Sequence, residues 1–171
     1  MLARDPLANP ERLIPRVYAY VAYRIGDGPD AEDVTSDTFE RALRYRASYD
    51  PRRGDPLNWL IGIARRRIAA GTAPSNADLE QHPEAAAPGD VGDDAVRRLT
   101  ISAAVASLDD RDRELIALRY GADLTARQIA SVLELRTNTV EVALHRALGR
   151  LRQRLGAAEG AEHRSDVRAE L

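Results

Sequence analysis

Apolar residues recur at helical spacing along most of the chain, with polar residues filling the positions between them. In the N-terminal part, this pattern predicts helices over about 11–25 and 31–47 and a third helix that begins after Asp55-Pro56. We expect Asp30 to cap the second helix and Asp55 to cap the third, with Pro56 in its first turn. The third helix has an apolar inner face, formed by Leu57, Leu60, Ile61, Ala64 and Ile68.

The segment 124–155 contains two helical patterns separated by a break at 134–138. Thr125 and Gln128 fit a capping box for the first of these helices. Asn138 and Glu141 fit a capping box for the second, although its start could lie a residue or two earlier. Two helices joined by a tight turn are therefore predicted, which is a helix-turn-helix arrangement.

Between the two helical parts, residues 71–94 carry six acidic residues and no arginine, together with Pro74, Pro83 and Pro88. Such a segment buries too little apolar surface to offset its chain entropy. We predict an all-α protein with two small helical domains, over 1–71 and 95–155, joined by a flexible acidic linker over 72–94. We expect a frayed tail over 156–171, and a short helix on a partner is the alternative.

Charge is distributed unevenly along the chain. All 25 basic residues are arginine, and the net charge is −2. Genomic base composition is enough to explain arginine in place of lysine, so only the placement of the arginines is informative. Segment 50–70 has a net charge of +3 and segment 124–155 has a net charge of +4. The order is therefore basic, acidic, basic, and the net charge of −2 averages segments of opposite sign, so it does not argue against a nucleic-acid binder.

Several classes of protein are disfavoured by composition. The chain has no cysteine and three scattered histidines, so we predict no metal site and no cofactor. No combination of nucleophile and base suggests an enzyme. The N-terminus lacks the apolar core of a signal peptide, and no apolar run is long enough to span a membrane, so we expect a cytoplasmic protein.

Two polar surfaces are candidates for binding. The exposed face of the second helix could be a solvated surface or a docking surface. Arg65, Arg66 and Arg67 are consecutive in the third helix, so at least one of them must point outward. Trp59 is interpreted as a packing anchor rather than a wedge between bases.

The segment AEDVTSDTFERALRYRASYDPRRGDPLNWLIGIARRR resembles region 2 of the extracytoplasmic-function (ECF) sigma factors, members of the sigma-70 family of bacterial RNA polymerase. Downstream, LDDRDRELIALRYGADLTARQIASVLELRTNTVEVALHRALGRLRQRL resembles region 4 of the same family. The two segments occur in the family's order, with a linker between them. The resemblance implies promoter-specific transcription initiation, with core RNA polymerase and promoter DNA as partners and an anti-sigma factor as a further one.

The resemblance also implies three sets of site residues. Binding of core polymerase is assigned to Asp33, Ser36, Asp37, Glu40 and Arg41. Binding of the −10 element is assigned to Arg52, Arg53, Asp55, Asn58, Arg65, Arg66 and Arg67. Binding of the −35 element is assigned to Arg127, Arg136, Thr139, Val142, Ala143, His145, Arg146 and Arg150, with Arg146 as the main candidate for a base contact.

Some positions depart from the family's pattern. Glu134 stands where the turn often has glycine, so a left-handed backbone there would cost about 1 kcal/mol, or the turn has another shape. Val142 and Ala143 make the groove face more apolar, which suits contact with thymine methyl groups. The alternatives are a stand-alone helix-turn-helix regulator, an enzyme, and a regulatory paralogue within the family.

Overall fold

The computed structural model describes residues 5–71 and 93–169, and no strand occurs among them. The predicted linker lies almost wholly outside the described residues. The N-terminal unit contains α1 (Pro10–Ile25), α2 (Pro29–Arg44), the short 3₁₀ helix η1 (Arg46–Ser48) and α3 (Pro56–Gly71). The C-terminal unit contains α4 (Asp93–Ala106), α5 (Asp110–Ile116), the π-helical turn η2 (Ala117–Gly121), α6 (Ala126–Leu133) and α7 (Thr137–Ala169). The all-α prediction is confirmed.

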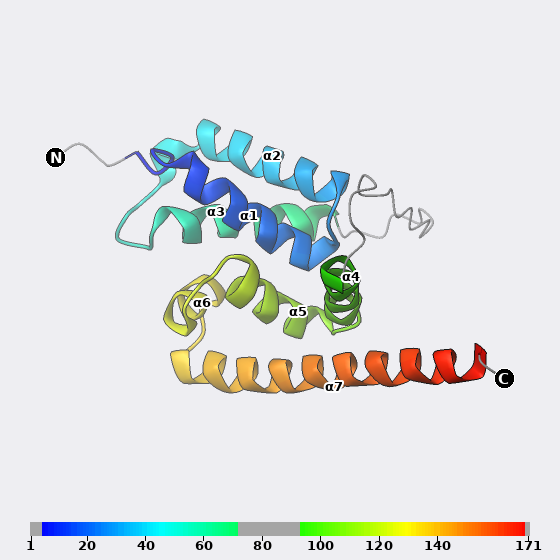
Figure 1. Cartoon of the computed structure of the whole chain (residues 1–171). Helices are drawn as coiled ribbons and strands as arrows, with labels where there is room; N and C mark the ends of the chain where they lie inside the picture. Colours follow the sequence, from blue (N-terminus) through cyan, green and yellow to red (C-terminus); the bar gives the residue numbers. More distant parts are fainter. Residues whose placement is uncertain (1–4, 72–92, 170–171) are drawn as a thin grey trace.

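In the N-terminal unit, α1, α2 and α3 pack against one another (Figure 1). Their buried side chains include Val17, Tyr20 and Val21 from α1, Ala31 and Ala42 from α2, and the predicted inner face of α3. Tyr18 and Tyr23 are partly buried against this core, so the tyrosines of α1 have packing roles.

The predicted start and end of α2 are both wrong by a few residues. The helix begins at Pro29 with Gly28 as its N-cap, so Asp30 lies in the first turn rather than capping it. Gly28 has φ of 130°, a conformation that favours glycine. The helix ends at Arg44, where Tyr45 gives way to the 3₁₀ turn η1. The cap of α3 is as predicted, because Asp55 Oδ1 accepts a hydrogen bond from the Asn58 amide at 3.0 Å.

In the C-terminal unit, α7 packs across α4, α5 and α6. It begins at Thr137, so Asn138 lies in the first turn and does not cap the helix. The earlier start that the sequence also allowed is the one observed. The helix continues to Ala169 and extends beyond the rest of the molecule, where the sequence predicts a frayed tail (Figure 1). No proline interrupts this stretch, and a glycine such as Gly156 costs a helix only about 1 kcal/mol.

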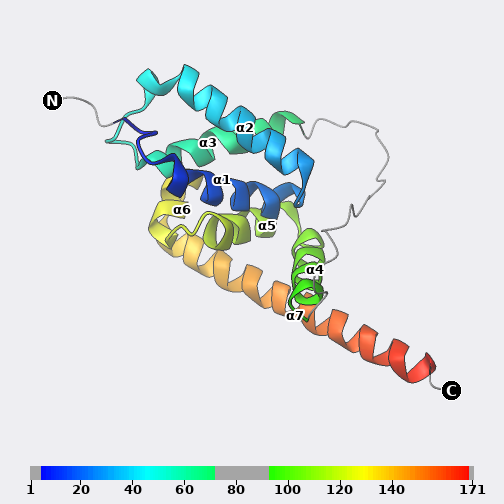
Figure 2. The ribbon, with the colours of Figure 1, turned by 45° about the horizontal axis from the view of Figure 1, so that its top comes forward.

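The two units pack directly against each other. In both views α1 lies between α2 and the helices of the C-terminal unit, and α7 forms the outer layer on the opposite side (Figures 1 and 2). Helix α1 contacts η2, α4 and α5, and α3 contacts α6. The buried residues of both units form one continuous hydrophobic core. Within 5–71 and 93–169, no helix has the length and apolar character needed to cross a membrane.

Candidate nucleic-acid interface

The N-terminal part of α7 has one buried face and one exposed face. Val140 and Ala147 are fully buried, and Leu144 is nearly so, which fixes the orientation of the helix on the core. Half-buried Ala143 lies at the boundary between the faces. The exposed face carries four of the predicted −35 residues: Thr139, Val142, His145 and Arg146. The structure therefore presents a short polar and apolar surface of the kind that enters a major groove.

Helix α6 precedes α7 and begins with the predicted capping box. The Thr125 hydroxyl accepts from the Gln128 amide at 3.3 Å, and Gln128 Oε1 accepts from the Thr125 amide at 2.9 Å. Glu134 follows α6 with φ of 56° and ψ of 40°, a left-handed conformation. The sequence allowed either a left-handed backbone at Glu134 or a turn of another shape, and the structure has the left-handed backbone. The turn fixes the angle at which α7 leaves α6.

Arg127, Arg136 and Arg150 are the predicted phosphate contacts of this unit. The first two are exposed, and no ion pair to them is found within the described part of the chain. Arg150 differs, because its NH2 group donates to Asp112 Oδ1 at 2.7 Å and its Nε donates to Asp112 Oδ2. This hydrogen bonding raises the pKa of Arg150. Arg150 thus joins α7 to α5, in addition to any contact with DNA.

In the N-terminal unit, the loop between η1 and α3 carries Arg52 and Arg53 on the surface. Asp50 Oδ1 accepts from the Arg52 amide at 3.0 Å, which holds the predicted turn. Trp59 at the start of α3 is half-buried, and its ring centroid lies 5.5 Å from that of Tyr49. The packing role predicted for Trp59 is confirmed.

The three consecutive arginines of α3 have different environments. Arg65 Nε donates to Glu114 Oε1 at 2.8 Å, and Arg67 Nε donates to Asp37 Oδ2 at 2.6 Å. Arg66 is exposed and has no ion pair among the residues described. The expectation that at least one of the three points outward is confirmed for Arg66.

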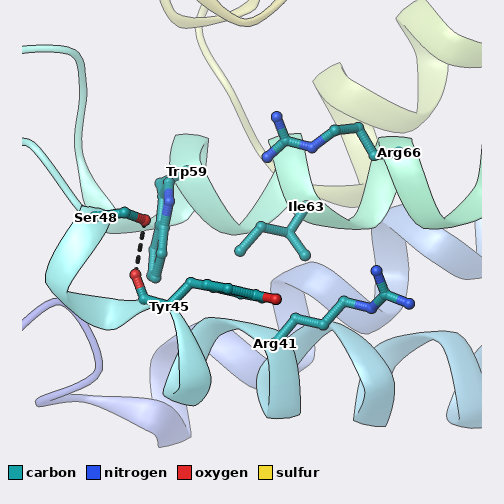
Figure 3. A pocket seen from close by; sticks show the side chains of 6 residues that line it. All are labelled: Arg41, Tyr45, Ser48, Trp59, Ile63 and Arg66. Carbon is teal, nitrogen blue, oxygen red and sulfur yellow. Dashed lines mark hydrogen bonds between the residues drawn. The ribbon is translucent and has the colours of Figure 1, made fainter.

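Arg66 also lines a small pocket of about 210 Å³ on the surface of the N-terminal unit. The other lining residues are Arg41, Tyr45, Ser48, Trp59 and Ile63. Figure 3 shows the aromatic rings of Tyr45 and Trp59 at one end and the guanidinium of Arg66 extending toward Trp59. The Ser48 hydroxyl donates to the Tyr45 carbonyl at 2.7 Å, which closes the turn after α2 (Figure 3). Two rings and two guanidinium groups are suited to a planar base and its phosphate.

Comparison with known proteins identifies both units. Residues 11–70 match sigma-70 region 2, and residues 98–151 match sigma-70 region 4. The ECF RNA polymerase sigma factor SigK of Mycolicibacterium vanbaalenii is 30% identical over 152 residues, covering 84% of this chain and 78% of SigK. The chain belongs to the ECF sigma factors of the sigma-70 family. It is therefore a sigma factor, a protein that directs promoter recognition in transcription initiation.

Solved structures of other proteins have a similar fold. The sigma factor RpoE from Bartonella quintana, in complex with the anti-sigma factor NepR, gives a TM-score of 0.65 at 19% identity, covering 84% of this chain and 92% of RpoE. CnrH, in complex with the cytosolic domain of CnrY, gives a TM-score of 0.61 at 22% identity, covering 87% of this chain and 83% of CnrH. Both likenesses support the two-unit helical fold.

The predicted polymerase-binding face of this sigma factor lies on α2. Asp33, Ser36, Glu40 and Arg41 are exposed there. Asp37 is half-buried, and burial would raise its pKa, but hydrogen bonds from Arg41 and Arg67 hold that pKa below its usual value. Asp37 therefore connects α2 to α3 as well as lying beside the exposed face.

The contacts between the two regions were missed by sequence reasoning. Glu114 pairs with Arg24 and Arg65, and Arg16 donates to the Ala122 and Asp123 carbonyls. A Cβ atom at Gly121 would come within 2.9 Å of the Tyr20 backbone. In the sequence, Glu114 is one acidic residue among several in the region 4 segment. Nothing in the spacing of residues relates it to Arg24, its partner ninety positions earlier. Arg65 and Asp55, both assigned to the −10 element, also contact region 4 here.

Proposed function

We propose that this sigma factor binds core RNA polymerase and places region 4 on the −35 element and region 2 on the −10 element, acting in the cytoplasm and without catalytic chemistry of its own. The observation that carries the proposal is the exposed face of α7, where Thr139, Val142, His145 and Arg146 lie opposite the buried residues that orient the helix. Such a face fits the major groove of B-DNA.

In the proposed −35 complex, Arg146 reads a base edge, because its long side chain lies on the outer face of the recognition helix. Val142 is 52% exposed and is suited to contact with a thymine methyl group. Arg127 and Arg136 hold phosphates on either side of the groove, which gives affinity without sequence preference.

In the proposed −10 complex, Arg52 and Arg53 hold the backbone of the melted strand, and the Gly54–Asn58 loop lies beside an extruded base. The 210 Å³ pocket next to this loop is a suitable place for that base, since Trp59 and Tyr45 offer aromatic surface and Arg66 offers a guanidinium that has no ion pair within 5–71 and 93–169. This assignment adds Tyr45 and Trp59 to the residues expected from the sequence.

Polymerase and regulators are the proposed protein partners. The exposed face of α2, with Asp33, Ser36, Glu40 and Arg41, docks on the polymerase clamp, and region 4 docks on the flap. An anti-sigma factor is included because the similar sigma factor RpoE was solved in complex with one. A solvated face without a partner is the competing interpretation for α2.

A run-off transcription assay tests the proposal. Purified chain added to core RNA polymerase should give a defined transcript from a cognate promoter, and core polymerase alone should give none. A stand-alone regulator would instead bind duplex DNA tightly without polymerase, since such proteins read paired half-sites as dimers. Tight, sequence-specific duplex binding by the free chain, together with no polymerase-dependent transcript, would contradict the sigma-factor mechanism and favour that alternative.

A further inference from the structure

Asn138 lies in the first turn of α7, where its side chain does not cap the helix. The Val140 amide donates to the Arg136 carbonyl at 3.1 Å, so the helical hydrogen bonds begin before Asn138. The side chain of Asn138 is exposed and makes no hydrogen bond with any of the residues that the structure describes. Its amide group is therefore available to a partner outside the chain.

The buried residues of α7 show which way Asn138 points. The core side of the helix is defined by three buried residues: Val140, Leu144 and Ala147. At about 100° per residue, Asn138 and Val142 lie within about 30° of the opposite direction, whereas Arg146 lies about 50° to one side. Asn138 thus points away from the core nearly as directly as Val142, which already belongs to the predicted groove face, and it lies one turn earlier.

The outward side of α7 is open to a large partner. In both views α7 is the outer layer of the described part of the chain (Figures 1 and 2). Gly149 lies on the same line as Asn138, about three turns later, and a Cβ atom there would meet nothing within 4 Å. The fold therefore does not require glycine at this position, and the missing side chain lets a partner surface approach the helix closely.

The short side chain of Asn138 suits the N-terminal end of a recognition helix, because residues at that end contact the base edges. Arg136, two residues earlier, is exposed and can hold a phosphate at the edge of the groove. An asparagine amide bonds to adenine through both polar atoms: Nδ2 donates to N7, and Oδ1 accepts from the N6 amino group. Among the four bases, only adenine offers this acceptor and donor side by side in the major groove.

We propose that Asn138 is a base-reading residue of region 4 and that it selects an adenine in the −35 element. The inference rests on the proposed function, because it requires α7 to enter the major groove of that element. Asn138 and Val142 are four residues apart, which is about 6 Å along the helix, or about two base-pair steps of 3.4 Å. The adenine therefore lies within about two base pairs of the thymine methyl group that Val142 contacts.

Base selection is measured with holoenzyme formed from core RNA polymerase and the full chain. A barcoded promoter library, randomised at the −35 and −10 elements, is transcribed, and the transcripts are sequenced. We expect the parent holoenzyme to prefer adenine at one −35 position by about tenfold, and Asn138→Ala to reduce this preference to about twofold or less. Gln153→Ala is the control, because it removes an exposed amide about four turns further along α7 and should keep the parent's preference.

Asn138→Asp tests base reading by a change of preference. A carboxylate cannot donate to adenine N7, but it accepts from the N4 amino group of cytosine. The preferred base at the same position should therefore change from adenine to cytosine. Urea unfolding tests the competing role in capping, since Asn138→Ala should keep the parent's midpoint if no cap is lost. A lower midpoint together with an unchanged adenine preference would assign Asn138 to the stability of α7 and overturn the inference.

The atom that Asn138 reads is tested by placing 7-deazaadenine at the preferred position, which removes the N7 acceptor and keeps base pairing. Transcription by the parent holoenzyme should fall about fivefold, and transcription by Asn138→Ala should not fall. An equal fall in both, or the same adenine preference in both, would overturn the inference and leave the proposed function standing, because transcripts are still made. No transcript from any member of the library would overturn the proposed function, and the inference with it.

Discussion

Arg150 of the recognition helix donates its NH2 group to Oδ1 of Asp112 at a distance of 2.7 Å. The Asp112 side chain is only 3% exposed, whereas that of Arg150 is 49% exposed. The Asp112 amide also donates to Asp109 Oδ1, the cap of α5, at 2.8 Å. A buried carboxylate at the start of α5 thus sets the position of α7, and with it the direction in which the groove-facing residues point.

This pairing predicts a structural role for Arg150. Arg150→Ala should lower the urea midpoint of unfolding, because it leaves a buried carboxylate without its cationic partner. Arg152→Ala, at a neighbouring exposed position, should change stability by less than about 0.5 kcal/mol. Equal urea midpoints for the two variants would mean that the Arg150–Asp112 pair does not stabilise region 4.

Arg146 should behave differently from Arg150. Its side chain is exposed on the groove-facing side of α7, so Arg146→Ala should leave stability unchanged and cost about 1–3 kcal/mol on a preferred −35 sequence. The measurement is the yield of open complexes formed by the variant holoenzyme on a panel of −35 variants. A uniform loss over the whole panel would make Arg146 a phosphate contact, and base reading would then have to be sought at His145, Val142 or Ala143.

The α2 face yields a prediction about core polymerase. Asp33→Arg combined with Glu40→Arg should weaken binding to core enzyme by about tenfold or more, since complementary charge across an interface is replaced by repulsion. Both positions are exposed, so the fold should be retained. Asp37 is unsuitable for this test, because it accepts hydrogen bonds from Arg41 and Arg67. Glu11→Arg is the control, and unchanged binding by the double variant would identify α2 as an ordinary solvated face.

The sequence predicted the helices well where the signal is local. The inner face of α3, the Asp55 cap and the Thr125–Gln128 capping box depend on residues within one helical turn, and all three occur in the structure. Errors arose where local signals compete. Asp30 and Asn138 both have side chains suited to capping, but neither caps its helix. Helix α2 begins at Pro29, after Gly28 with its positive φ, and α7 begins at Thr137, after the turn at Glu134.

The sequence predicted which residues belong to each candidate site, but it did not predict how those residues are arranged relative to one another. Periodicity showed that Arg65, Arg66 and Arg67 could not all be buried, but it could not say which of them meets Glu114. The interface between the two units depends on the shape of η2 and on the approach of Gly121 to Tyr20, a contact between residues about a hundred positions apart. Such contacts depend on three-dimensional packing and leave no periodic trace in a single sequence.

Tyr20 should make stability sensitive to alkaline pH. Burial raises the pKa of its phenol far above the ordinary value of 10.0, and the Glu114 carboxylate adds to this effect. The folded state therefore keeps Tyr20 protonated while the unfolded chain ionises, so its contribution is fully present below pH 10 and is lost as the pH rises above it. The loss should reach at most about 1.4 kcal/mol per pH unit for this one group.

The absence of lysine makes this titration easier to interpret, because few groups other than tyrosine titrate between pH 9.5 and about 11.5. Urea unfolding over this range should show a smaller alkaline slope for Tyr20→Phe than for the parent chain. Tyr120→Phe is the control, since its ring is 51% exposed. If the alkaline slope is the same in Tyr20→Phe and in the parent chain, the loss of stability at high pH comes from other tyrosines. Tyr18 and Tyr49 also have raised pKa values.

Glu134 provides a test of the strained turn between α6 and α7. Its φ of 56° brings the Cβ close to the following carbonyl oxygen, at a cost of about 1–2 kcal/mol for a residue with a side chain. Glu134→Gly removes that strain but gives the unfolded chain more freedom, which offsets about 0.4–1 kcal/mol of the gain. We expect a net stabilisation of up to about 1 kcal/mol by urea unfolding. Glu141 lies in the regular part of α7, where its backbone is not strained. Glu141→Gly should therefore destabilise the protein by about 1 kcal/mol, because glycine is a poor helix former. If both glycine variants lose stability equally, the left-handed turn at Glu134 is not the conformation that region 4 adopts in solution.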